Sequence, residues 1–298
     1  MSYNLPKLCP SATWNPTVNT LGNNWKKDDS ASSVFVNTNN MIYVAVYSAD
    51  RVLAFVPGKP TPNKTYSSGL KNPGSVFATV NGDLYIGNED SNKRVERWNS
   101  TSTSGAPVMT TPQVCFGLFI DISNTLYCSM NKAHQVIRRS LNNSNTSGST
   151  AAGNGSPGSD NNQLDRPYGI FVNSNLTLFV ADYGNDRIQR FDFGNPNGTT
   201  VVLNGFSGSL SQPSGVVLDA DGYLFIADSG NSRIIGSGPK GFRILIDRLQ
   251  NTDGNKKKDS AKPMSLSFDS GGNIYITGTI TNPVQKVKLA TNSCGNFS

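Results

Sequence analysis

The chain has 298 residues, of which 36% are hydrophobic, and carries a formal net charge of +6. This composition can form a hydrophobic core and argues against disorder throughout. The longest apolar runs, such as the one that starts at Met41, have the length of a strand, which is too short to span a bilayer. No charged and then apolar leader precedes the first residues, so we expect that any secretion signal has been removed or never existed.

The dominant feature is a unit that occurs six times. Each unit has an apolar strand, a turn rich in Asn, Asp or Gly, a second apolar strand, a polar turn, and then in most copies Arg before a β-branched residue. The fullest copies are RPYGIFVNSNLTLFVADYGNDRIQRF and QPSGVVLDADGYLFIADSGNSRII. In chain order, the six copies start at Ser32, Asn72, Val114, Arg166, Gln212 and Lys262.

The spacing of these units predicts the fold. The residues at the equivalent position after the second turn are Arg51, Arg94, Gln135, Arg187, Arg233 and Val284, so the mean step from 51 to 284 is about 47 residues. This period is typical of a four-stranded propeller blade. We therefore predict an all-β, six-bladed β-propeller over residues 14–295, with an N-terminal arm at 1–13 and a C-terminal tail at 296–298.

The ends of the chain predict how the ring closes. After the third strand of the sixth unit, near Leu289, only nine residues remain, which is too few for a turn and a fourth strand. The segment TVNTLGN, which starts at Thr17, is therefore expected to complete the last blade. The alternative is that this strand enters the last blade of a neighbouring molecule, and repeated exchange would then build a filament.

The stretches LFVADYGNDRIQRF and LFIADSGNSRI, each preceded by Pro-x-Gly and a first strand, resemble the NHL repeat. The match is specific in units four and five and loose elsewhere, since His134 and Gln135 replace the usual pattern in unit three and residues 281–284 have lost it. The resemblance implies a propeller and a structural role for the repeat residues. NHL domains bind proteins, bind RNA or act as enzymes, so the fold alone does not assign a function.

We expect the recurring polar residues to be structural. Asp182 and Asp228 end strands, where an Asp side chain can accept backbone N–H groups two residues further on. Arginine suits backbone carbonyls at contacts between blades. The arginines concerned are Arg51, Arg94, Arg187 and Arg233. Asn173, Asp219 and Asp269 fall in the first hairpin turn of their units.

The four cysteines allow three pairings if all are oxidised. Cys115 and Cys128 flank a predicted hairpin, and Cys9 and Cys294 lie at the two chain ends, so we predict these two disulfides. They indicate an extracellular protein, whereas four free thiols would fit a cytosolic one.

Seven Asn-x-Ser/Thr sequons also favour secretion, although a chain rich in Asn, Ser and Thr produces sequons by chance. They lie at Asn63, Asn99, Asn142, Asn145, Asn175, Asn197 and Asn296. The best candidates lie between strands, at Asn99, Asn142, Asn145 and Asn197. The polar insertion that starts at Asn142 is expected to be a flexible, glycosylated connection.

The sequence contains no catalytic motif that we recognise. The propellers that this chain resembles include a zinc-dependent lyase, whose metal site needs several histidines. This chain has a single histidine, His134. We therefore expect no catalytic residue, no metal site and no cofactor, with His134 at a turn. The alternative enzyme is a calcium-dependent, lactonase-like propeller, because Asn and Asp oxygens are plentiful.

The positive charge raises nucleic acid as a partner, since some NHL domains bind RNA. The basic clusters are dispersed, at residues 26–27, 138–139 and 256–258, which argues against RNA binding. We therefore predict a non-enzymatic, extracellular glycoprotein that interacts with a protein or glycan partner, or with copies of itself.

Overall fold

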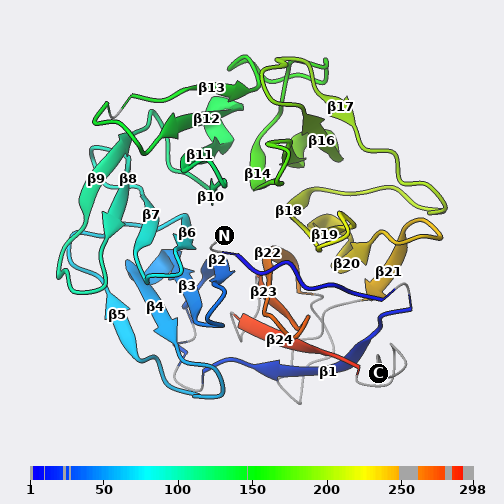
Figure 1. The fold of residues 1–298 in the computed structure, drawn as a ribbon, viewed down its shortest axis with the longest axis horizontal. Coiled ribbons are helices and arrows are strands. Elements are labelled where there is room, and N and C mark those ends of the chain that lie inside the picture. The colour runs from blue at the N-terminus through cyan, green and yellow to red at the C-terminus, as the bar shows by residue number, and fades with distance from the viewer. Residues whose placement is uncertain are drawn as a thin grey trace.

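The computed structural model describes residues 3–9, 11–22, 25–26, 28–145, 147–247, 261–278 and 284–290. Six antiparallel sheets of four strands each surround a central channel, so the predicted six-bladed propeller is confirmed (Figure 1). Apart from four short 3₁₀ turns, the described elements are strands. None of the helical segments in the described ranges has the length and apolarity that a membrane crossing requires.

The first three blades follow the chain without interruption. Blade 1 contains β2 (Ala31–Val36), β3 (Ile42–Val46), η1 (Tyr47–Ala49), β4 (Arg51–Phe55) and β5 (Lys64–Tyr66). Blade 2 contains β6 (Ser75–Ala78), β7 (Leu84–Asn88), β8 (Arg94–Trp98) and β9 (Ala106–Thr110). Blade 3 contains β10 (Gly117–Ile120), β11 (Thr125–Met130), η2 (Asn131–Ala133), β12 (Gln135–Ser140) and β13 (Ser149–Ala152).

The next two blades repeat this plan, and the sixth differs only in the origin of its outer strand. Blade 4 contains β14 (Pro167–Val172), β15 (Leu178–Asp182), η3 (Tyr183–Asn185), β16 (Arg187–Phe191) and β17 (Thr199–Thr200). Blade 5 contains β18 (Pro213–Leu218), β19 (Leu224–Asp228), η4 (Ser229–Asn231), β20 (Arg233–Gly236) and β21 (Arg243–Ile246). Blade 6 contains β22 (Pro263–Phe268), β23 (Ile274–Gly278), β24 (Val284–Leu289) and β1 (Trp14–Thr20).

The second strand is buried along its whole length in every blade except blade 3, where Thr125 at the start of β11 is partly exposed, and β3, β15 and β23 are examples. These strands carry apolar residues at successive positions because neighbouring blades cover both faces of each sheet. The first hairpin turns form as predicted. Asp219 Oδ1, for example, accepts the backbone N–H groups of Asp221 at 3.0 Å and Tyr223 at 2.9 Å.

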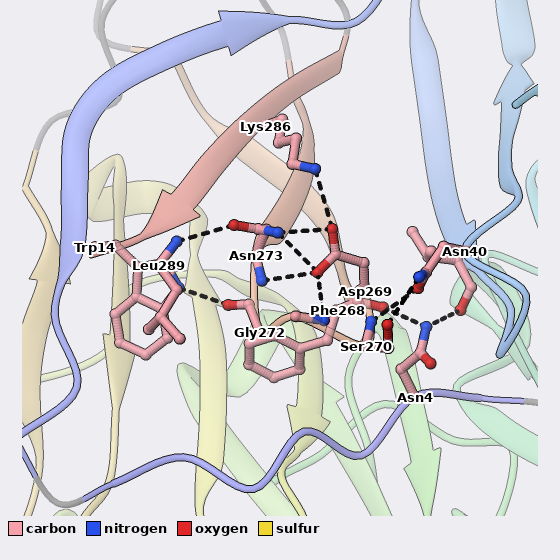
Figure 2. Close-up of polar contacts among 12 residues, drawn as sticks. Asn4, Trp14, Asn40, Phe268, Asp269, Ser270, Gly272, Asn273, Lys286 and Leu289 are labelled. Carbon is pink, nitrogen blue, oxygen red and sulfur yellow. Dashed lines mark hydrogen bonds and ion pairs between the residues drawn. The ribbon is translucent and has the colours of Figure 1, made fainter. Parts of the chain in front are cut away.

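β1 closes the ring, as the sequence predicted. It pairs antiparallel with β24 of the same chain, with Val18 opposite Val287 and Thr20 opposite Gln285. The strand starts at Trp14, three residues before the predicted start. Figure 2 shows the polar contacts of this closing blade, in which Trp14 Nε1 donates to the Gly272 carbonyl at 2.9 Å and Lys286 Nζ lies 3.1 Å from Asp269 Oδ2.

The arm before β1 runs from the centre of the ring to its rim (Figure 1). Asn4 Nδ2 donates to the carbonyls of Asn37 at 2.9 Å and Phe268 at 3.0 Å (Figure 2). Both carbonyls lie where a first strand ends, so we call this side of the propeller the arm face. Tyr3 is buried, and its ring centroid lies 4.8 Å from that of Phe119 and 5.4 Å from that of Phe171. Tyr3 therefore plugs the channel at the arm face.

The polar insertion in blade 3 corrects one expectation. Residues 149–152 form β13, the outer strand of the blade, and Ala152 is buried. Further along, the carbonyls of Ser159 and Asp160 accept hydrogen bonds from Arg187. The prediction of a flexible connection throughout was wrong, because strand pairing and Arg187 satisfy backbone groups that side-chain composition cannot reveal.

Candidate functional site

The carboxylates of the repeat are structural, but their partners differ from those expected. Asp182 is fully buried, and its Oδ2 accepts Arg187 Nε at 2.7 Å while its Oδ1 accepts the backbone N–H of Asp165 at 2.7 Å. The expected N–H groups two residues further on are not the partners we find, because the side chain points back to the connection that enters its own blade. Asp228 repeats the arrangement with Arg233 Nε at 2.6 Å and the N–H of Ser211. Burial raises the pKa of Asp182.

Each repeat arginine pairs with a carboxylate. Arg187 also donates to the carbonyls of Ser159 and Gln163, as predicted for this residue type. Arg51 lies 2.7 Å from Asp29, and Arg94 lies 2.6 Å from Glu96. These side chains are therefore engaged within the fold.

His134 lies at the end of η2 with a positive φ of 50°. Its Nδ1 lies 3.3 Å from the backbone N of Arg166, at the entry of the next blade, and 3.2 Å from Asp165 Oδ1. Asp50 and Asp186 hold the same position in their blades, and each accepts a backbone N–H of the next blade at 2.7–2.8 Å. The predicted turn histidine is therefore also a contact between blades.

A disulfide joins Cys115 to Cys128, the pair predicted from the hairpin, with 5.3 Å between their Cα atoms. Cys128 lies opposite Leu118, so Cys115 precedes the paired part of β10 and reaches Cys128 diagonally. The predicted partner of Cys9, Cys294, lies outside the described residues, as does the sequon at Asn296. The six remaining sequon asparagines are exposed, at Asn63, Asn99, Asn142, Asn145, Asn175 and Asn197.

Of the three basic clusters, residues 138–139 are fully described, and both side chains make contacts within the fold. Arg139 is buried and donates to the carbonyls of Val108, Asn143 and Asn145, while Arg138 lies over the ring of Phe193. Residues 256–258 lie outside the described ranges.

Acidic side chains do not gather into a metal site in the described part of the chain. No group of three or more His, Cys, Asp or Glu residues there could hold an ion. Asp269 has the densest polar contacts in Figure 2, but both its oxygens accept donors from its own blade, which include Asn273 and Lys286. The predicted calcium alternative has no carboxylate among the described residues that line the channel.

The channel itself is narrow. A cavity of about 70 Å³ lies between Tyr3 at the arm face and Phe116 and Met264 toward the opposite face. This volume holds a few water molecules, whereas sites for small ligands typically occupy at least about 300 Å³. A ligand of ordinary size therefore does not fit inside the channel, but it can contact the mouth of the channel on the face opposite the arm.

Two positions of each blade supply that mouth. One is the first residue after the second strand, which is Tyr47, Glu89 and Tyr183 in blades 1, 2 and 4. The other is the residue just before the glycine of the first strand. This residue is Phe116 in blade 3, before Gly117, and Tyr168 in blade 4, before Gly169. All five side chains are half-buried. They form the candidate site, which we call the aromatic mouth.

The four rings of the aromatic mouth form a continuous arc. The centroids of Tyr47 and Phe116 lie 6.4 Å apart with nearly parallel planes, those of Phe116 and Tyr168 lie 5.1 Å apart, and those of Tyr168 and Tyr183 lie 4.9 Å apart. Tyr47 reaches past blade 2 because Gly74, the blade 2 equivalent of Phe116, has no side chain. Exposed aromatic surface of this kind is typical of ligand-binding sites.

Glu89 ends the arc. Its Oε2 accepts the hydroxyl of Tyr47 at 2.5 Å. Burial and this hydrogen bond raise the pKa of Tyr47 to about 12, so its hydroxyl remains a donor at neutral pH. Sequence analysis missed these five residues. An alignment of the six units would have placed Glu89 beside the tyrosines, but the aromatic mouth, with Glu89 included, exists only because side chains from four blades meet.

Fold and mouth together define a six-bladed propeller with a one-sided, aromatic opening. Residues 210–236, in blade 5, match the NHL repeat, and this match together with the six-bladed fold supports the resemblance to NHL-repeat propellers. No curated protein sequence matches it.

Three solved structures show the same fold at low identity. The structure of a streptogramin B lyase is 10% identical, with a TM-score of 0.61 over 92% of this chain and 98% of that one. An auxiliary nutrient binding protein from Bacteroides thetaiotaomicron is 14% identical, with a TM-score of 0.61 over 97% and 75%. A chain of a nidogen/laminin complex is 17% identical, with a TM-score of 0.57 over 70% and 76%.

Proposed function

We propose that this protein is a non-enzymatic binding module that takes its ligand at the aromatic mouth. The observation that carries the proposal is the arc of four half-buried rings at the one end of the channel that Tyr3 does not plug. Two structures of the same fold, an auxiliary nutrient binding protein and a chain of a nidogen/laminin complex, are consistent with such a role.

The proposal can be tested without knowledge of the natural ligand. The ten tyrosines can be labelled as 3-fluorotyrosine, and their ¹⁹F signals followed during titration with neutral, cationic and anionic aromatic probes. We expect the signals of Tyr47, Tyr168 and Tyr183 to shift. Tyr168→Ala should abolish binding, and Tyr223→Ala, a half-buried ring on the arm face, should not. If no probe shifts the signals of the mouth, the proposal fails.

The same proposal includes secretion and N-glycosylation. A disulfide and six exposed sequon asparagines support it. Treatment of material from the natural source with an amidase specific for N-glycans should lower its mass. An unchanged mass would contradict glycosylation and favour a cytosolic location.

A further inference from the structure

Several of the charges around the mouth are paired, but among the described residues that of Glu89 is not. Asp50 lies 2.7 Å from Lys71, Asp90 pairs with Arg94, and Asp165 Oδ1 lies 3.6 Å from Arg166 Nε. Within the described ranges, no lysine, arginine or histidine pairs with Glu89, and the Tyr47 hydroxyl is the side-chain donor that it has. A half-buried carboxylate without a counter-ion has lost part of its hydration and gained no opposite charge in return.

The aromatic arc favours positive charge at the same place. The faces of aromatic rings carry negative electrostatic potential, and a cation within about 6 Å of a ring centroid is stabilised by it. At the far end of the arc, the guanidinium of Arg166 lies 5.5 Å from the centroid of Tyr183. The end formed by Tyr47 and Glu89 has no such cation among the described side chains, although it combines a ring with a carboxylate.

We propose that the aromatic mouth binds an organic ammonium group carried on an apolar body, with the charge beside Glu89 and the body against Phe116 and Tyr168. This inference rests on the proposed function. The carboxylate supplies a charge-assisted partner, and the half-buried rings supply apolar surface. A net charge of +6 repels cations at long range, so recognition depends on these short-range contacts.

The test compares three probes of similar size and different charge. Benzyltrimethylammonium, benzyl alcohol and benzoate are titrated into fluorotyrosine-labelled protein. We expect the cation to bind at least about tenfold more tightly than the neutral alcohol, and benzoate to bind more weakly than both. Acetyl-trimethyllysine amide carries the same charged group on a peptide backbone, so its affinity relative to benzyltrimethylammonium distinguishes a peptide-borne from a free ammonium.

Glu89→Gln removes the charge and retains an acceptor for the Tyr47 hydroxyl. It should abolish most of the preference for the cation without changing the affinity for benzyl alcohol. Asp221→Asn, at an exposed carboxylate on the arm face, is the matched control and should change neither affinity. Equal binding of all probes at the mouth, or an unaltered preference in Glu89→Gln, would overturn the inference and leave the proposed function standing. If none of the probes binds at the mouth, the proposed binding function itself is wrong.

Discussion

At the scale of single residues, position determines the role more than identity does. Asp50, His134 and Asp186 are chemically different, yet each accepts a backbone N–H at the entry of the next blade. Each also has positive φ, a conformation that Asn and Asp adopt more readily than most residues. A lone histidine in this sequence is therefore explained by the geometry of its turn.

Substitutions at His134 should follow this role. His134→Asn keeps an acceptor and suits positive φ, so we expect little change in the free energy of unfolding. His134→Ala leaves the N–H of Arg166 without its acceptor and should cost about 1 kcal/mol, measured by urea denaturation. Equal stability of both variants would show that the bond between blades contributes nothing.

The buried ion pairs should matter more than the exposed ones. Asp228→Ala leaves Arg233 without a carboxylate, and we expect a loss of about 3 kcal/mol in the free energy of unfolding. Asp192→Ala breaks an exposed pair with Arg190 and should change stability by less than about 0.5 kcal/mol. Comparable losses in the two variants would contradict the structural role assigned to the repeat carboxylate.

At the scale of elements, the inner strands of neighbouring blades are held very close together. A Cβ atom on Gly169, in β14, would lie 2.7 Å from the Cα of Gly215 in β18, which is closer than real Cβ contacts. The glycine of the Pro-x-Gly that begins the first strand of these units is therefore a packing requirement. It allows the backbones of two blades to touch beside the channel.

Gly169→Ala should therefore destabilise the protein, since backbone atoms of the next blade would have to move. We expect a loss of about 1–3 kcal/mol, typical of overpacking. Gly238→Ala is the matched control, because a Cβ there meets nothing within 4 Å. Thermal unfolding of both proteins measures the difference, and an unchanged midpoint for Gly169→Ala would refute the close contact.

At the scale of the whole molecule, one N-terminal segment has two roles. Its strand β1 completes blade 6 at the outer edge of the propeller, and its Tyr3 fills the channel at the arm face. Deletion of residues 1–22 leaves β24 as an open edge and removes Tyr3 from the channel. Unpaired edges promote aggregation, and we expect a loss of more than about 4 kcal/mol, beyond most single substitutions. Urea denaturation and light scattering measure both effects. A peptide of residues 3–22 added in trans should restore stability, and an unaffected truncated protein would exclude N-terminal closure.

The sequence predicted the repeating features, the closing strand and the Cys115–Cys128 disulfide, but it missed the path of the arm and the aromatic mouth. Six units, their turns and the closing strand follow from a period of about 47 residues and from the short remainder after Leu289. The path of the arm has no period, so nothing indicated that Tyr3 would reach Phe119 and Phe171. The aromatic mouth was also beyond prediction, because local pattern does not tell which blades bring their side chains together.

Because Tyr3 fills the channel at the arm face, the mouth on the opposite face is the expected opening of the channel. Among the described residues, Tyr3 covers the cavity at the arm face, so we expect water that enters beneath Phe116 and Met264 to leave through the mouth while the arm stays in place. A molecule bound to the rings of the aromatic mouth would then block this opening. The trapped water would exchange with bulk solvent no faster than the occupant departs. The residence time of a bound molecule would therefore set both its own dissociation rate and the exchange rate of the water behind it.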